Sequence, residues 1–352
     1  MSRYWNKITS SLVPYIPGEQ PKDKKYIKLN TNENPYPPSP KVLAAIKEIT
    51  NDDLRLYPDP TCENFRNVVA EYHGLSRNQI FVGNGSDEIL AFSFNAFFDT
   101  SKPILFPDIT YSFYKVYAHL YGLQYELIPL DDQFNVPLDK FNSVNGGIII
   151  PNPNAPTAKY IPADFFKTTL RNNMNQVVII DEAYIDFGGE SAIKLIDEFP
   201  NLLVVQTLSK SRSLAGLRVG VAMGNEELIE GLNRIKNSFN SYTLDRLGLA
   251  GAIAAYQDKE YFKQTTQKVI MTRENTIEKL KKLNFNVVES KANFVFISHR
   301  KVPAKIIFQD LREKGILVRY FEQPRIDNYL RVSIGTDDEM NSFIRVLSQI
   351  VD

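Results

Sequence analysis

The sequence has 352 residues, 41 basic and 41 acidic, so its formal net charge at pH 7 is +0, and 43% of it is hydrophobic. A neutral chain without a dense lysine or arginine run disfavours nucleic acid as the main partner, and no stretch approaches the ~18 apolar residues of a membrane span. The single cysteine, Cys62, excludes an intrachain disulfide, and with three scattered histidines it disfavours a metal site. We expect a cytoplasmic protein with no metal and no signal peptide, long enough for one large and one small domain.

The first part of the chain is rich in turn-forming residues. Pro14, Pro17, Gly18 and Pro21 fall within a short stretch that has no clear helical or strand period. Such a segment does not form a core of its own and must pack on something else. We predict an arm over residues 1–29 that packs with the small domain.

Short apolar runs alternate with helix-like segments such as Asp87–Phe98 and Tyr111–Leu120 between about residues 80 and 225. The runs are continuously apolar, which is typical of strands covered on both faces. We predict an α/β domain over residues 30–240 with a mostly parallel, seven-stranded sheet. The predicted strands are Ile80–Val82, Ile104–Phe106, Tyr125–Ile128, Ile148–Ile150, Val177–Ile180, Leu202–Val205 and Val219–Ala222.

The pattern changes after residue 225. A long helical stretch covers Glu226–Leu283, with breaks expected near Asn240 and Asp258. Short strands and two further helices follow it, which indicates a small α+β domain over residues 241–352. The predicted elements are strands Asn286–Val288, Phe294–Ile297, Ile316–Val318 and Leu330–Ile334, a helix over Ala304–Lys314 and a last helix from Asp337.

The most informative segment runs from Thr207 to Gly220. Lys210 follows a buried-looking strand beside Ser209, and Arg218 comes eight residues later in Ala-Gly-Leu-Arg. An aldehyde cofactor that carries a phosphate needs an amine to bond with, and hydroxyl and guanidinium groups to hold the phosphate. Asp181 follows another apolar run and can pair with a pyridinium nitrogen. Together these two segments suggest pyridoxal phosphate.

Three further motifs follow predicted strands. Gly83–Glu88 opens a helix whose free N–H groups attract phosphate, or it is a plain turn capped by Ser86. Tyr111 can stack on a planar ring or belong to the core. The proline-dense loop Pro151–Thr157 lies where α/β sheets place ligands, or is only a structural turn. Its Ala155–Pro156 bond is predicted to be cis.

With these residues in place, the sequence resembles the fold-type I pyridoxal-phosphate aminotransferases, and most closely the histidinol-phosphate aminotransferases. The resemblance runs nearly end to end. It is specific for fold and cofactor, and less specific for the substrate. The matching motifs are Leu29–Pro35, Arg55–Pro58, Gly83–Glu88, Asp181–Tyr184, Ser209–Lys210, Ala215–Gly220 and Leu330–Gly335.

The resemblance implies a homodimer with shared active sites and a role for each matching residue. Lys210 would bond with the cofactor's aldehyde, Asp181 would meet the ring nitrogen and Tyr184 the ring hydroxyl. Tyr111 would stack on the ring. The phosphate would be held by Gly85, Ser86, Asp87, Ser209 and Arg218, with Tyr57 reaching it from the neighbouring subunit. The substrate's anionic end would be received by Arg331, with Arg319 and Tyr15 as accessory residues.

One position departs from the family pattern. The family has asparagine directly before the proline of Asn-Pro-Thr-Gly, whereas this chain has Ala155 there, Asn154 one position earlier and Ala158 for the glycine. Either Asn154 makes the bond to the ring hydroxyl through a shifted loop, or Tyr184 makes it alone.

The implied reaction is amino-group transfer from L-histidinol phosphate to 2-oxoglutarate, which gives imidazole-acetol phosphate and L-glutamate in histidine biosynthesis. An aromatic amino-acid aminotransferase and a phosphothreonine decarboxylase share much of the pattern and stay open. A non-catalytic cofactor-binding regulator is disfavoured, because no segment is left over for a DNA-binding domain.

Overall fold

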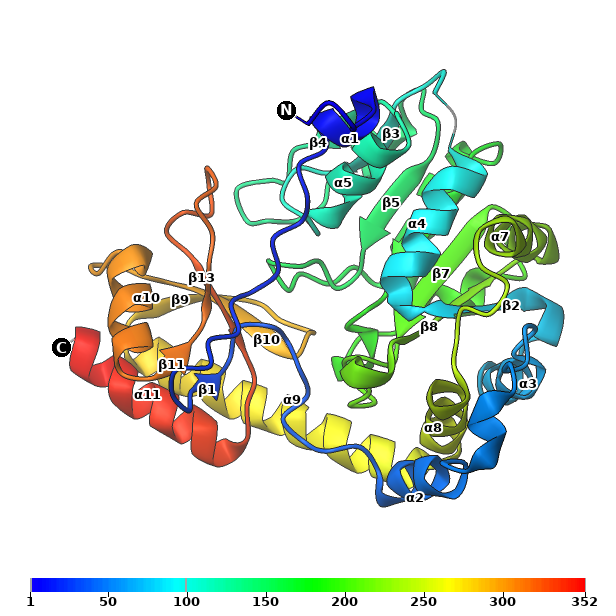
Figure 1. Ribbon diagram of the computed structural model, residues 1–352. Coiled ribbons are helices and arrows are strands. Elements are labelled where there is room, and N and C mark those ends of the chain that lie inside the picture. The colour runs from blue at the N-terminus through cyan, green and yellow to red at the C-terminus, as the bar shows by residue number, and fades with distance from the viewer. Residues whose placement is uncertain (1, 99, 352) are drawn as a thin grey trace.

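A computed structural model describes residues 2–98 and 100–351 and shows a large α/β part beside a smaller α+β part (Figure 1). A seven-stranded sheet forms the large part, in the order β2-β8-β7-β6-β5-β3-β4. β8 pairs antiparallel with β2 and β7, and the other pairings are parallel, so the predicted sheet is confirmed. Its strands are β2 (Ile80–Asn84), β3 (Ile104–Pro107), β4 (Tyr125–Ile128), β5 (Ile148–Pro151), β6 (Val178–Asp181), β7 (Leu202–Thr207) and β8 (Val219–Gly224).

Helices cover both faces of this sheet, which explains why its strands are apolar throughout. In β5, Ile149 packs on one face, while Ile148 and Ile150 pack on the other. The first face is covered by α4 (Gly85–Phe97), α5 (Phe113–Leu120) and α7 (Glu226–Phe239). The second is covered by α3 (Glu63–His73), α6 (Phe166–Asn172) and α8 (Arg246–Gln257), with α2 (Pro40–Glu48) outside α8.

The small part contains a four-stranded antiparallel sheet in the order β12-β13-β10-β9. The predicted strand 316–318 is found as β11, which pairs with β1, but the short strand β12 that follows it and pairs with β13 was not predicted. The elements are β9 (Phe285–Val288), β10 (Phe294–His299), β11 (Ile316–Leu317), β12 (Arg319–Tyr320), β13 (Leu330–Ser333), α10 (Ala304–Glu313) and α11 (Asp337–Val351). The long helix α9 (Lys259–Lys282) runs beneath both parts in Figure 1.

The N-terminal arm crosses from one part to the other (Figure 1). It begins with a short helix, α1 (Lys7–Ser11), near the α5 side of the large part, and ends in β1 (Ile27–Lys28), which pairs parallel with β11. Between them, Arg312 forms an ion pair with Glu19 at 3.1 Å.

The predicted domain boundaries, residues 1–29, 30–240 and 241–352, stay a prediction. Met1, Asp99 and Asp352 lie outside the described residues. Among the helices of residues 2–98 and 100–351, none is both long and apolar enough to cross a membrane.

Candidate active site

A pocket of about 500 Å³ lies at the carboxyl edge of the large sheet, between the two parts and under the arm. Three lining residues, Pro151, Asp181 and Thr207, are the last residues of the adjacent parallel strands β5, β6 and β7. Arg218 also reaches this edge, because β8 runs in the opposite direction and Arg218 directly precedes it. Parallel α/β sheets place ligands at this edge.

The structure brings most of the predicted site residues together in this one pocket. Of the predicted residues, Gly85, Asn154 and Tyr57 do not line it. The predicted residues that do are Tyr15, Ser86, Asp87, Tyr111, Asp181, Tyr184, Ser209, Lys210, Arg218, Arg319 and Arg331.

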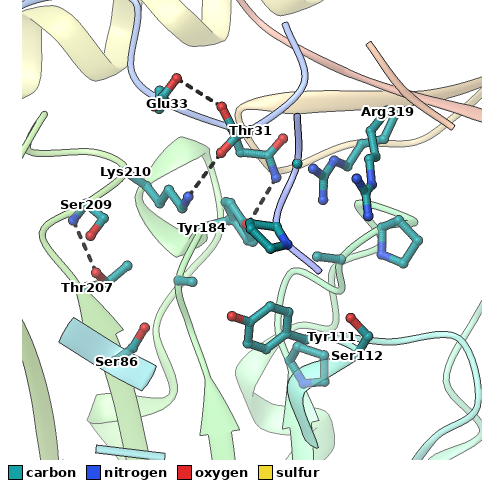
Figure 2. A pocket seen from close by; sticks show the side chains of 18 of the residues that line it. Thr31, Glu33, Ser86, Tyr111, Ser112, Tyr184, Thr207, Ser209, Lys210 and Arg319 are labelled. Carbon is teal, nitrogen blue, oxygen red and sulfur yellow. Dashed lines mark hydrogen bonds between the residues drawn. The ribbon is translucent and has the colours of Figure 1, made fainter. Parts of the chain in front are cut away.

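Lys210 follows β7 and points its amine across the pocket (Figure 2). Its Nζ donates a long hydrogen bond of 3.4 Å to the carbonyl of Thr31 and lies 5.9 Å from the centre of the Tyr184 ring. Its own carbonyl accepts a hydrogen bond from Nδ2 of Asn34 at 2.9 Å. The backbone is thus fixed while the amine is held only weakly, as a reacting amine requires.

One end of the pocket is built for an anion. The Arg218 guanidinium donates to Asp87 Oδ2 at 3.0 Å and to Ser209 Oγ at 3.3 Å. Ser86 lies in the first turn of α4, whose N-cap, Asn84, makes no side-chain cap bond, so the helix N–H groups stay available. Ser86 is therefore not the cap that the simpler explanation required.

Two glycines make this close approach possible. Gly85 has φ of +76°, and a Cβ there would lie 2.6 Å from Nη2 of Arg218. A Cβ on Gly220 would lie 2.5 Å from the backbone carbon of Gly85. Gly85 therefore shapes the anion end through its backbone without lining the pocket.

Asp181 and Tyr111 both line the pocket. Asp181 is 5% exposed, and burial raises its pKa to about 6 despite hydrogen bonds from the Tyr114 hydroxyl and the Ala183 N–H. The Tyr111 hydroxyl donates to Asp87 Oδ1 at 2.9 Å, which fixes the ring beside the anion end. The sequence expectation of a buried carboxylate with a partner at residue 181 is met by Tyr114.

The other end of the pocket carries two arginines. Arg319 and Arg331 are direct partners in the β12–β13 ladder, and both guanidinium groups lie 5.8 Å from the Phe321 ring centre. Arg331 Nη2 donates to the carbonyl of Asn30 at 2.9 Å, and burial lowers the Arg331 pKa. Within the described residues, neither arginine has an acidic partner. Like charges opposite each other destabilise a sheet, so this pair indicates a site for an anion.

The arm closes the pocket over this arginine end. Tyr15 packs its ring 4.7 Å from Phe113 and 6.2 Å from Tyr111, both centre to centre. The Pro17–Gly18 segment of the arm lines the pocket as well. The arm is therefore a wall of the site and not only a strap on the small part.

The proline-dense loop presents a different residue from the one expected. Asn154 is fully buried, and its Nδ2 donates to the carbonyl of Ile109 and to Thr157 Oγ1, each at 2.9 Å. Ala155 lines the pocket in its place. The Ala155–Pro156 bond is cis as predicted, and Asn152–Pro153 is cis as well.

Sequence reasoning missed several residues that build the site. Nδ2 of the buried Asn32 donates to the Tyr184 hydroxyl at 3.0 Å, and the Thr31 carbonyl accepts from Lys210. Thr207 Oγ1 accepts from the Ser209 N–H at 3.1 Å (Figure 2). Asn32 and Thr31 belong to the Leu29–Pro35 motif, which was noticed but given no role. The sequence around Phe321 does not indicate a role in the site, because its contacts with Arg319 and Arg331 depend on how the strands pair.

The donor set fits a phosphorylated pyridine aldehyde. Hydroxyl groups, a guanidinium and a helix N-terminus lie at one end, close to an amine on Lys210. A tyrosine ring and a buried carboxylate line the same pocket, together with the two arginines. Gly85 and Gly220 allow Arg218 and the start of α4 to pack this closely, because a Cβ at either position would clash with them.

Comparison with known proteins agrees with this fit. The family model for aminotransferase class I and II matches residues 24–347. The histidinol-phosphate aminotransferase of Clostridium acetobutylicum is 62% identical over 100% of both chains, and that of Clostridium beijerinckii is 60% identical over 100% of this chain and 98% of its own.

A solved structure is similar over the whole chain. The histidinol-phosphate aminotransferase of Sinorhizobium meliloti, solved in complex with pyridoxal-5'-phosphate, has a TM-score of 0.90 at 22% identity and covers 100% of this chain and 98% of its own. This likeness shows that the fold is shared. The family model and the two clostridial relatives show that the chain belongs to the class I and II aminotransferase family, and its cofactor is pyridoxal phosphate.

Proposed function

We propose that this protein transfers the amino group of L-histidinol phosphate to 2-oxoglutarate in histidine biosynthesis, giving imidazole-acetol phosphate and L-glutamate. The observation that carries the proposal is a single pocket with three features. It holds the amine of Lys210, an anion site at Arg218 and a second pair of cationic side chains, Arg319 and Arg331. The full-length likeness to two clostridial histidinol-phosphate aminotransferases supports this choice of substrate.

Each end of the pocket has a separate task in this proposal. Ser86, Ser209 and Arg218 would hold the cofactor phosphate, and Lys210 would attach the cofactor covalently through its amine. Pyridoxal phosphate, when bound, supplies an aldehyde and a ring that accepts the electron pair of a breaking bond. Tyr111 would stack on that ring, and Asp181 would hold the protonated ring nitrogen. With Ala155 at the pocket wall, the Tyr184 hydroxyl would bind the ring hydroxyl.

Proton transfer is assigned to Lys210. When it is not attached to the cofactor, Lys210 Nζ would be the base that takes the proton from the substrate carbon and the acid that gives it back. The weak 3.4 Å contact with Thr31 would leave the amine free to move for this task. The Tyr184 hydroxyl is oriented by Asn32 and does not need to move.

The arginine end explains how one pocket can serve two substrates. The phosphate of histidinol phosphate and a carboxylate of 2-oxoglutarate are both anions remote from the reacting group. Guanidinium groups bind either one with two parallel hydrogen bonds. In the view of Figure 2, Arg319 lies across the pocket from Ser86 and Ser209, so a substrate anion and the cofactor phosphate would not compete.

A substrate panel tests the assignment. Steady-state kinetics with histidinol phosphate, phenylalanine, tyrosine and phosphothreonine should give the highest kcat/KM for histidinol phosphate, with glutamate formed from 2-oxoglutarate. A preference for phenylalanine or tyrosine would instead make the protein an aromatic amino-acid aminotransferase. Release of carbon dioxide from phosphothreonine would make it a decarboxylase.

We further propose that the enzyme is a homodimer in which Tyr57 serves the neighbouring site. Tyr57 is 78% exposed, stacks on Tyr242 with ring centres 4.6 Å apart and does not line the pocket of its own chain. Two exposed leucines, Leu54 and Leu56, lie near it in the sequence. Apolar side chains gathered at a surface mark an interface. In a two-fold dimer each copy then gives and receives the same segment.

Mixing variants tests this arrangement. Tyr57→Phe chains mixed with Lys210→Ala chains give dimers in which one site carries both defects and the other carries neither. We expect activity above that of either parent at limiting pyridoxal phosphate. Tyr4→Phe is the control, because Tyr4 is an equally exposed tyrosine on the arm. Dimers of Tyr4→Phe chains alone should bind the cofactor and turn over like the wild type. If mixed dimers form and no activity is regained, Tyr57 does not act across the interface.

A further inference from the structure

A tyrosine that does not line the pocket donates a hydrogen bond to the pocket carboxylate of Asp181. Tyr114 lies in α5 and is fully buried, and its hydroxyl donates to Asp181 Oδ2 at 2.7 Å. The Tyr114 ring is enclosed by Phe94, Phe106 and Tyr111, whose ring centres lie 6.4, 5.9 and 5.6 Å away. A ring held on three sides cannot swing away, so the position of its hydroxyl is fixed by packing.

The two oxygens of Asp181 are therefore in different situations. Oδ2 accepts the short hydrogen bond from Tyr114, whereas from the described part of the chain Oδ1 accepts only a longer one of 3.3 Å, from the Ala183 N–H. Asp181 lines the pocket and Tyr114 does not. Oδ1 is the oxygen left to receive a ligand's N–H group.

Burial works against the charge that this role needs. It raises the Asp181 pKa to about 6, and the nearby negative charge of Asp87 on α4 raises it further, while the bonds from Tyr114 and Ala183 lower it. Tyr117, one turn along α5, donates to the backbone of Asp87. The cationic groups of the same pocket are Lys210, Arg218, Arg319 and Arg331, and its other phenols are Tyr15, Tyr111 and Tyr184.

We propose that Tyr114 is a positioning residue of the aminotransferase: its hydroxyl orients Asp181 and keeps it ionised, so that Oδ1 can hold the protonated ring nitrogen of the cofactor. This inference rests on the proposed function, which assigns Asp181 to that nitrogen. A neutral phenol suits the task because it stabilises the anion without cancelling its charge. A cation in the same place would compete with the ring nitrogen for the carboxylate.

The test compares Tyr114→Phe with a matched control. Tyr125→Phe removes the same hydroxyl from a tyrosine of the same aromatic cluster, stacked on Phe106 at 5.2 Å, with no contact to Asp181. Asp181→Asn is the reference for loss of the carboxylate charge. Each apoenzyme is unfolded with denaturant at several pH values, and each holoenzyme is titrated for cofactor affinity, cofactor absorbance and kinetics.

The apoenzyme readout has a defined sign. Because the folded pKa of Asp181 lies above its ordinary value of 3.8, the folded state binds more protons, and stability falls as pH rises from about 4 to about 6. Without the Tyr114 hydroxyl the folded pKa rises further. We therefore expect Tyr114→Phe to keep losing stability relative to Tyr125→Phe above about pH 6, whereas Asp181→Asn loses this pH dependence.

The holoenzyme readouts follow from the same charge. Tyr114→Phe should weaken cofactor binding about tenfold, as expected for one hydrogen bond to a charged group. It should also shift the pH titration of cofactor absorbance and lower kcat with little change in substrate KM. Superimposable curves for Tyr114→Phe and Tyr125→Phe would overturn the inference alone, provided Asp181→Asn impairs binding and turnover. An Asp181→Asn enzyme with normal binding and turnover would overturn the assignment of Asp181 as well.

Discussion

Lys210→Ala is expected to lose nearly all transamination, with turnover falling at least about 10⁴-fold, the upper range for a positioned acid–base group. The variant removes both the covalent attachment of the cofactor and the group that moves the proton. It should also lack the absorbance band of a cofactor bound covalently through its aldehyde. The measurements are single-turnover kinetics and the absorbance spectrum of the purified protein.

The fold should survive this change. The Lys210 side chain makes one long hydrogen bond, to Thr31, and the bonds from Asn34 that fix this turn go to backbone carbonyls. We expect a loss of no more than about 1 kcal/mol in unfolding free energy. Lys194→Ala, which removes a surface lysine paired with Asp164 and Glu190, is the matched control and should keep full turnover. Turnover near the wild-type level in Lys210→Ala would refute the mechanism.

The large sheet could be predicted because its strands carry their own signal. Each is a short apolar run buried on both faces, such as Ile148–Ile150, and helical periods separate several of them. The breaks near Asn240 and Asp258 were also confirmed, as α7, α8 and α9 end or begin there. Local chemistry decided these elements, so one sequence was enough.

The small part was harder to predict because pairing between distant segments decides it. The sequence predicted one strand over residues 316–318, yet β11 pairs with β1 of the arm, and the short strand β12, which pairs with β13, was not predicted. The partner β1 lies almost three hundred residues earlier in the chain. No local pattern in the sequence indicates which distant strand such a short segment pairs with.

The same limit applies to the site. The places of Lys210, Asp181 and Arg218 in the pocket could be predicted because each lies at or within three residues of a strand end at the ligand-binding edge. The orientation of Asn154 could not, because it depends on contacts with Ile109 and Thr157 in a loop with two cis prolines. The contact of Tyr114 with Asp181 could not be predicted for another reason. From the sequence, a tyrosine in an aromatic helix is indistinguishable from an ordinary core residue, and only the structure shows the partner of its hydroxyl.

Arg331→Lys is expected to lower kcat/KM for histidinol phosphate and for 2-oxoglutarate alike. Lysine keeps the positive charge but lacks the planar fork that gives two parallel hydrogen bonds. In Arg331, Nη2 donates to the Asn30 carbonyl while other guanidinium N–H groups remain for a ligand, whereas all donors of lysine lie on one nitrogen. The loss should be about 1.5–3 kcal/mol for each substrate, the range for a hydrogen bond to a charged group.

The pattern of the loss distinguishes this role from a general weakening of the fold. Nε of Arg331 is buried without a hydrogen-bond partner among the described residues, and the guanidinium lies over Phe321 and Phe294, so it is preorganised for an anion. KM for both substrates should rise while cofactor affinity stays unchanged, because Arg331 is at the end away from Ser209 and Arg218. Arg345→Lys, on the exposed face of α11, supplies the control and should match the wild type. Unchanged kcat/KM for both substrates in Arg331→Lys would remove this residue from the substrate site and leave Arg319 as the receiver of the anion.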